Sequence, residues 1–341
     1  GDILPTVIST VSERAFYTLH CGIPPQSGTL PLAVVLQTRA DKLTRTAQLG
    51  FWSEAKVARL FVDNLTVMDF SDLDADRGVV GESWIVDIEL GGELDDQGMV
   101  FDFGHVKKQI KQLIDAQADH RVLVPAAYAG CRTQSVGNDL LVEFSLANGG
   151  LIQHQSPRDA VLLVTSDVIS AEVVAEDLAL QLRSVLPDNV SDVLVKLRCE
   201  EIEGAFFHYS HGLQKHQGQC QRIAHGHRSR LELSVHGARD RELEAQWVAK
   251  LRDIYIASEE HISGKTVHNG MAHIDMAYDA AQGHFSLSVP EHQVFVVPCV
   301  STVENIANHL ALAASTDCGL AVQVKAFEGV GKGAFGSAET V

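Results

Sequence analysis

The chain has 341 residues, of which 45% are apolar, and a formal net charge of −17 at pH 7. This length and apolar content predict about two globular domains rather than a disordered or fibrous protein. The acidic balance argues against a nucleic-acid or anionic-membrane partner, since both need a basic face, and no apolar run reaches membrane-spanning length.

Six cysteines are scattered through the chain without a C-x-x-C pair. This spacing is typical of reduced thiols and not of a disulfide framework. The apolar run LPLAVVL is short and no basic segment precedes it, so it does not read as a secretory signal. We therefore expect a cytoplasmic protein.

The first repeating unit is predicted over residues 57–199, after an extension of unknown role over residues 1–56. Long alternating runs from Val57 onward predict an antiparallel hairpin. An amphipathic helix is expected within residues 99–120, and further strands precede a second helix that Ser170 could cap. With a closing strand, the order is β-β-α-β-β-α-β.

The second unit, residues 200–341, repeats this order of elements. Strand-like patterns over residues 206–235 correspond to the first hairpin, and the run over residues 241–261 corresponds to the helix within 99–120. Such self-similarity indicates a tandem duplication. We therefore predict an α+β fold of two β-β-α-β-β-α-β-like units with antiparallel sheets.

Three histidines of the second unit predict a metal site. His225 and His227 are two residues apart on a predicted strand, so they share one face, and the hairpin brings His211 beside them. Three neutral imidazoles with one position left open are typical of catalytic zinc. The alternative is chance, since the chain has 16 histidines, and Cys220 taken alone would be an ordinary buried thiol.

The pattern F-x-x-x-H-x-L, then Cys, then H-G-H resembles the 6-pyruvoyl-tetrahydropterin and 6-carboxy-tetrahydropterin synthase family. The resemblance implies the tunnelling fold, or T-fold, whose units complete barrels by sheet-to-sheet association. It also implies a Zn²⁺ ion on the three histidines and a catalytic cysteine. The matching positions are Phe207, His211, Leu213, Cys220 and His225-Gly226-His227.

The two units are not chemically equal. Where the second unit has its H-G-H, the first has Val80-Gly81-Glu82, and we align Asn64 with His211. The first unit therefore cannot hold zinc in the same way.

The resemblance implies that the site forms between neighbouring units. The first unit ends its helix at Asp119-His120, similar to the family's L-D-H motif, in which an Asp-His pair joins the cysteine in proton transfer. A capped helix end is the plain alternative, and we align Glu260-His261 with this pair. Rings of alternating units would contain an even number of units, so we expect a homo-oligomer, with two chains as the simplest closure.

Four further residues are candidates for binding the substrate. Glu328 matches the family's glutamate that anchors a pterin through its amino-pyrimidine edge, although a solvated strand end is the alternative. Thr302 and Glu304 fit the family's helix-start motif near the ligand, and capping alone would also explain Thr302. Arg222 belongs to a basic cluster that could face a triphosphate.

The resemblance implies a zinc-dependent carbon–oxygen lyase acting on 7,8-dihydroneopterin triphosphate, in queuosine or biopterin biosynthesis. The product could be a 6-carboxy- or a 6-pyruvoyl-tetrahydropterin, because the four residues between Cys220 and His225 match neither subgroup. No nicotinamide or flavin is implied. Two alternatives stand beside it: a pterin- or metal-binding protein without turnover, and a zinc hydrolase acting on another substrate.

Overall fold

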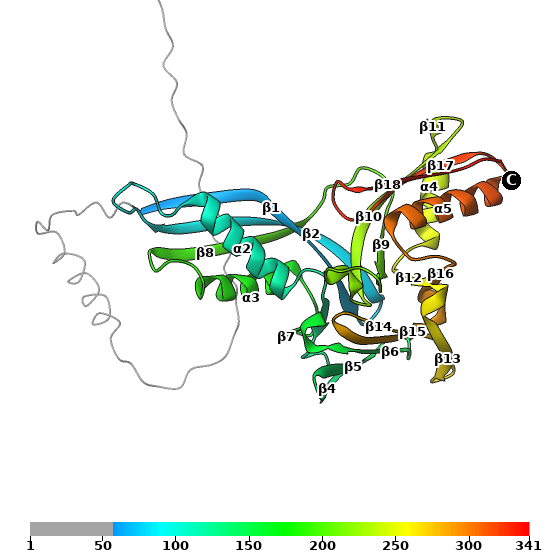
Figure 1. The fold of residues 1–341 in the computed structure, drawn as a ribbon, viewed down its shortest axis with the longest axis horizontal. Helices are drawn as coiled ribbons and strands as arrows, with labels where there is room; N and C mark the ends of the chain where they lie inside the picture. Colours follow the sequence, from blue (N-terminus) through cyan, green and yellow to red (C-terminus); the bar gives the residue numbers. More distant parts are fainter. Residues whose placement is uncertain (1–56, 341) are drawn as a thin grey trace, which may run out of the picture. The chain divides into compact units, whose positions relative to one another are not determined.

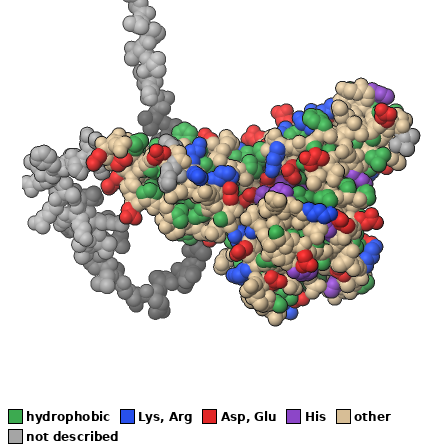
Figure 2. Space-filling model, in the orientation of Figure 1, with side chains coloured by type: hydrophobic (Ala, Val, Ile, Leu, Met, Phe, Trp, Pro, Cys, Tyr) green, Lys and Arg blue, Asp and Glu red, His purple; other side chains and the backbone are tan. Residues whose placement is uncertain are grey.

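The computed structural model describes residues 57–340, in which two units of similar element order follow one another. The extension predicted over residues 1–56 lies outside the described residues. Acidic and basic side chains are interspersed on the face that Figure 2 shows. None of the described helices combines the length and apolarity that a membrane-spanning helix needs.

The first unit builds a sheet of strand order β7-β3-β1-β2-β8, and helices α2 and α3 lie along it (Figure 1). Apolar side chains of both helices, such as Ile110, Ile114 and Leu178, pack with the sheet in one core. Ser170 caps α3, as predicted, by accepting the backbone N–H of Val173. The elements are β1 (Val57–Asp74), β2 (Gly78–Glu93), α2 (Phe103–Gln117), β3 (Val122–Pro125), β7 (Val161–Val164), α3 (Ala171–Arg183) and β8 (Val190–Cys199).

The second unit builds the corresponding sheet, of strand order β16-β12-β9-β10-β17-β18, with a short β11 paired to β10. Asp240 caps α4 and Thr302 caps α5, and apolar side chains of both helices pack against this sheet. The elements are β9 (Phe206–His211), β10 (His225–Val235), β11 (Ala238–Arg239), α4 (Arg241–Lys250), β12 (Ile254–Ser258), β16 (Val294–Val297), α5 (Val303–Cys318), β17 (Val322–Phe327) and β18 (Gly333–Ala338).

A third sheet joins the two units, because β6 of the first pairs antiparallel with β15 of the second. Its order is β13-β14-β15-β6-β5-β4, and its apolar face packs in a core that both units share. The strands are β4 (Cys131–Val136), β5 (Asp139–Ser145), β6 (Leu151–Pro157), β13 (Ile262–His268), β14 (Met271–Ala280) and β15 (Gly283–Pro290). Short 3₁₀ turns are η1 (Arg158–Ala160), η2 (Gln219–Gln221), η3 (Glu259–His261) and η4 (Glu291–Gln293).

The helix expected over residues 241–261 is shorter than predicted. The α4 helix ends at Lys250, and Ile254–Ser258 is the fully buried strand β12, parallel to β9 and β16. Asp253 has a positive φ of 52°, which ends the helical path, and the β-branched and aromatic residues that follow favour a strand. The sequence analysis misread this buried run as the last turns of a helix.

The two units meet face to face at a pair of glycines. Gly81 pairs with Ser71 in the first hairpin, Gly226 pairs with Ser210 in the second, and the two serine hydroxyls are 2.7 Å apart. A Cβ on Gly81 would lie 1.8 Å from the carbonyl oxygen of Tyr209, which is backbone and cannot move aside. Glycine is therefore required for this approach.

Substituting Gly81→Ala is expected to lower the free energy of unfolding by about 3 kcal/mol, because the added methyl group forces two sheets apart. Urea denaturation measures the loss. Gly264→Ala is the matched control, because a Cβ there would make only ordinary contact with Asp275. Equal stability of both variants would contradict the close approach.

Candidate active site

Three histidine rings converge at the β9–β10 hairpin. His211 ends β9 opposite His225, which begins β10, and His227 lies two residues further on the same strand. All three are buried, their nearest ring nitrogens lie within 4.8 Å of one another, and the Nε2 atoms of His211 and His227 are 3.3 Å apart. Two nitrogens bound to one tetrahedral zinc ion would be about 3.4 Å apart. The predicted trio is therefore spaced as metal ligands are.

The outer nitrogens of two of these rings are held by backbone carbonyls. His211 Nδ1 donates to the carbonyl oxygen of Ser301 at 2.8 Å, and His225 Nδ1 donates to that of Arg222 at 3.2 Å. These bonds leave both Nε2 atoms free of protons and directed inward. Burial lowers the pKa of His211 to about 3 and that of His225 well below its usual value. Both rings are therefore neutral, as metal ligands must be.

The third ring is oriented by a carboxylate from the first unit. His227 Nδ1 lies 3.3 Å from Asp69 Oδ1, and the Asp69 side chain is 4% exposed. Burial would raise the pKa of Asp69, but His227, Lys332 and the hydroxyl of Ser83 together hold it below its usual value. A carboxylate behind a histidine is a recurrent support of metal ligands. The sequence analysis missed Asp69, which carries no motif.

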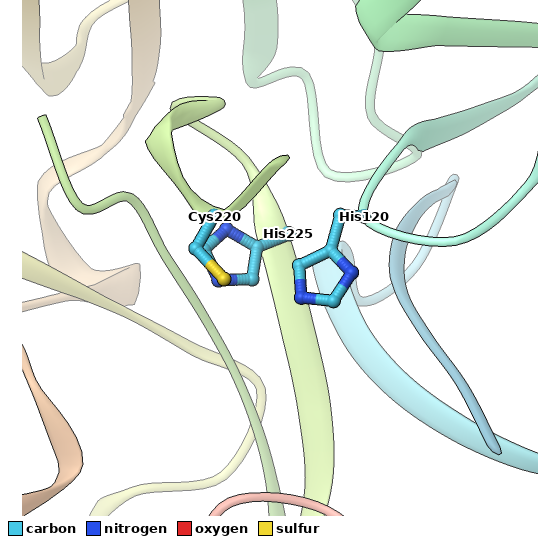
Figure 3. A group of neighbouring side chains, drawn as sticks. All are labelled: His120, Cys220 and His225. Carbon is cyan, nitrogen blue, oxygen red and sulfur yellow. The ribbon is translucent and has the colours of Figure 1, made fainter. Parts of the chain in front are cut away.

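Cys220 lies beside the histidines, as predicted. It sits in η2, the turn before β10, and its sulfur forms a group with ring nitrogens of His120 and His225 within 4.8 Å. Figure 3 shows His225 on its strand, Cys220 from the turn and His120 from a loop of the first unit. The ring centroids of the two histidines are 5.0 Å apart. One chain thus brings groups of both units to one point.

The Asp119-His120 pair lies at this point and not merely at a helix end. His120 Nδ1 is 2.7 Å from Asp119 Oδ2, and the other Asp119 oxygen accepts the backbone N–H of Asp69. Burial alone would lower the pKa of His120, but hydrogen bonds with Asp119 and Cys220 raise it to about 10. The His120 ring is therefore protonated, is held in place by Asp119, and can donate a proton next to the Cys220 thiol.

The counterpart of this pair in the second unit is not Glu260-His261, as aligned from sequence. Val122 of β3 lies opposite Ser71, and Tyr255 of β12 lies opposite Ser210. His120 is two residues before Val122, and Asp253 is two residues before Tyr255, so the two positions correspond. Both residues have a positive φ, 55° for His120 and 52° for Asp253. Glu260 instead pairs with Lys215 at 3.5 Å, and His261 packs on Tyr278. The error follows from reading β12 as helix.

The first unit has carboxyl groups at the positions that match His211 and His227 of the second unit. By strand register, Asp72 opposite Val80 corresponds to His211 opposite His225, so the alignment of Asn64 with His211 was eight residues off. Glu82 stands where the second unit has a histidine. Burial, with the charge of Glu82, raises the pKa of Asp72 well above its usual value, and burial raises that of Glu82 to about 7. Two carboxyl groups with raised pKa values thus stand where the second unit has His211 and His227.

The pKa of Glu82 predicts a pH dependence. A carboxyl with a folded pKa near 7 and an ordinary value of 4.5 stabilises the fold below pH 4.5, and this contribution is lost as the pH rises to 7. Relative to the parent chain, Glu82→Gln is expected to gain on the order of 3 kcal/mol in unfolding free energy between pH 4.5 and pH 8. Urea denaturation at both pH values measures it, and Glu176→Gln, an exposed carboxyl on α3, should show no such gain.

Glu328 directly follows the last residue of β17, Phe327. Burial raises the pKa of Tyr209, and the charge of Glu328 raises it further. The ring centroid of Tyr209 is 5.3 Å from that of His227. Lys332 is 3.9 Å from Glu328 and 3.3 Å from Asp69. The sequence analysis missed Lys332, although its position four residues after Glu328 could have suggested it.

The remaining residues predicted to bind the substrate are Thr302, Glu304 and Arg222. Thr302 caps α5 by accepting the N–H of Asn305, next to the carbonyl that holds His211, and Glu304 is exposed on the first turn. Arg222 is buried, donates to Gln282 and lies 3.3 Å from the carbonyl oxygen of His120. Its bonds support the turn that presents His120.

A family model described as 6-pyruvoyl tetrahydropterin synthase matches the chain twice, over residues 71–210 and 201–335. Proteins of Pyrococcus horikoshii and Pyrococcus abyssi that carry the name putative 6-carboxy-5,6,7,8-tetrahydropterin synthase are each 27% identical, over 121 and 124 residues. Each of these matches covers 36% of this chain and 68% of the relative.

Among solved structures, the 6-pyruvoyl tetrahydropterin synthase of Plasmodium vivax is 17% identical with a TM-score of 0.32. That of Plasmodium falciparum is 16% identical with a TM-score of 0.32. Both matches cover 42% of this chain and 98% of the other.

Proposed function

The chain belongs to the 6-pyruvoyl tetrahydropterin synthase family, and its units are tandem copies of the T-fold; on that basis we propose that it converts 7,8-dihydroneopterin triphosphate to a 6-substituted tetrahydropterin with loss of triphosphate. The enzyme class would be a carbon–oxygen lyase acting on phosphates. One observation carries the proposal: a thiol, a histidine and a cluster of neutral imidazoles meet where the two units join.

The residues that would hold zinc are His211, His225 and His227. They fit such an ion because their rings are neutral, their inner nitrogens converge and their outer nitrogens are held from behind. When bound, zinc would supply a Lewis acid that polarises the oxygens of the substrate side chain. Asp69 would keep the His227 ring in place as that charge develops.

The proton-transfer groups would be Cys220 and His120. The Cys220 sulfur, beside the imidazolium of His120, would act as the base that takes a proton from the substrate side chain. His120, oriented by Asp119, would donate a proton to the carbon or oxygen atom of the substrate side chain that becomes protonated in the reaction. Arg222 would fix the turn that carries His120 by bonding to its carbonyl oxygen.

Substrate binding would divide between the ring and the triphosphate. The carboxylate of Glu328 would accept two parallel N–H bonds from the pterin edge, while Thr302 and Glu304 would shape the helix start near the ligand. The triphosphate would have a cationic neighbour in Lys332, which lines a cavity of about 440 Å³ together with Arg230 and Lys325. Whether chains associate into rings with an even number of units remains a prediction.

Mass spectrometry of the products formed from 7,8-dihydroneopterin triphosphate, with zinc present, tests this function. A 6-carboxy or a 6-pyruvoyl product identifies the branch of the family. Tight pterin binding with no product would instead indicate a binding protein. Product formation from an unrelated ester, with no pterin affinity, would indicate a zinc hydrolase.

A further inference from the structure

A second cavity lies where Arg77 of the first unit meets β9 and α4 of the second. Its volume is about 600 Å³, larger than the cavity of about 370 Å³ beside His120 and Cys220. Volumes of roughly 300–1,000 Å³ are typical of small-molecule sites. The residues that line it include Arg77, Phe206, His208, Val248, Arg252 and Asp253, and we call it the second cavity.

The second cavity has lost the catalytic pair. Asp253 corresponds to His120, and the turn of the first hairpin, Ala75-Asp76-Arg77, contains no cysteine. Arg77 binds both carboxylate oxygens of Asp253, at 3.1 and 2.5 Å. A guanidinium–carboxylate pair offers neither a thiol nor an imidazole. The chemistry of the active site is therefore impossible here.

The groups that could bind a flat ring remain. Apolar side chains of α4, including Val248, and the rings of Phe206 and Phe207 line the second cavity. His208 Nδ1 donates to the carbonyl oxygen of Gly81 at 2.8 Å, which makes its Nε2 an acceptor. Burial lowers the pKa of His208 to about 4, so the ring is neutral. An N–H of a heterocycle could bond to this acceptor.

The rim of the second cavity carries cations without partners. Arg252 lines it and Arg241 lies beside Gly204 of its wall, where an added Cβ would be 2.7 Å from Arg241 Nη1. Both are exposed, and neither forms a salt bridge or hydrogen bond to the part of the chain that the structure describes. Unpaired guanidinium groups at a concave surface of an acidic protein favour phosphate groups.

We propose that the second cavity is a non-catalytic binding site for a bicyclic nitrogen heterocycle that carries an oligophosphate chain. His208 and the apolar wall hold the ring, and Arg241 and Arg252 hold the phosphates. The choice of a pterin as one such ligand rests on the proposed function, but a purine triphosphate shares the same chemistry. The duplicated chain would thus keep one site for turnover and one for binding.

Isothermal titration of the full chain with neopterin triphosphate, the fully oxidised form of the proposed substrate, tests this site. Two sites per chain are expected. Combining Arg241→Glu with Arg252→Glu should weaken binding at the second cavity at least tenfold and leave binding at the active site unchanged. Glu328→Ala should weaken binding only at the active site. Arg132→Glu, an exposed arginine on β4, is the control that should preserve both. Thermal denaturation of each variant verifies that it folds.

The outcomes separate this proposal from the proposed function. One site per chain, insensitive to the double arginine variant, would overturn the second site and leave the lyase intact. Two sites without any product would support the second site and count against the lyase. Inorganic triphosphate that binds as tightly as neopterin triphosphate would overturn the recognition of a ring. Tighter binding of GTP would support the site and identify a purine as its ligand.

Discussion

Replacing Cys220 with alanine is expected to lower kcat for 7,8-dihydroneopterin triphosphate by about 10²- to 10⁴-fold, the usual contribution of a general base. The sulfur lies with His120 and His225 in one group of possible ligand atoms, and alanine removes it with little change of volume. Zinc content should not change, because the proposed ligands are three imidazoles. Triphosphate release and metal analysis of the same preparation measure both quantities.

The matched control for this variant is Cys318→Ala. Cys318 is an exposed free thiol at the end of α5, and it should be dispensable for turnover. If Cys220→Ala kept the wild-type rate, the proton-transfer role of the thiol would be wrong. A loss of zinc in Cys220→Ala would instead make the thiol a fourth metal ligand, and the site a closed structural one.

The second large effect is expected at the proposed metal ligands. His225→Ala should lower zinc affinity at least about 100-fold, since removal of a mere supporting group behind a ligand already costs 10- to 100-fold. Activity should fall with it. Because zinc binds only the folded chain, added zinc should raise the melting temperature of the parent protein but not that of the variant. Metal titration and thermal denaturation provide two readouts independent of turnover.

His284→Ala is the control for the ligand variant. His284 is about half exposed on β15, pairs with Asp279 at 2.9 Å, and belongs to neither group of possible metal ligands among the described residues. It should bind zinc with the parent affinity. A His225→Ala chain that still bound one zinc ion as tightly as the parent would falsify the assignment of the three histidines.

The duplication explains why one chain can make a site that each unit alone could not. The second unit provides the imidazoles and the thiol, while Asp69, Asp119 and His120 come from the first. The pseudo-symmetric position in the first unit is built from Asp72, Glu82 and other residues. These residues cannot bind zinc in the way that neutral imidazoles do.

Local residue types in the sequence were enough to predict the fold family, the duplication and the convergence of His211, His225 and His227. Strand alternation puts His225 and His227 on one face regardless of the rest of the chain, and a two-residue spacing survives any error of alignment. The cap at Ser170 is equally local, since a hydroxyl finds its N–H within three residues.

Only the tertiary structure decided which residues meet across the interface between the units. The pairing of Asp69 with His227, the correspondence of Asp253 with His120 and the register that matches Asp72 with His211 depend on how two long hairpins align. Side chains alternate with a period of two along any strand, so periodicity cannot say which residue of β1 faces which of β2. Contacts distant in sequence set that register, as do two glycines that let the sheets approach.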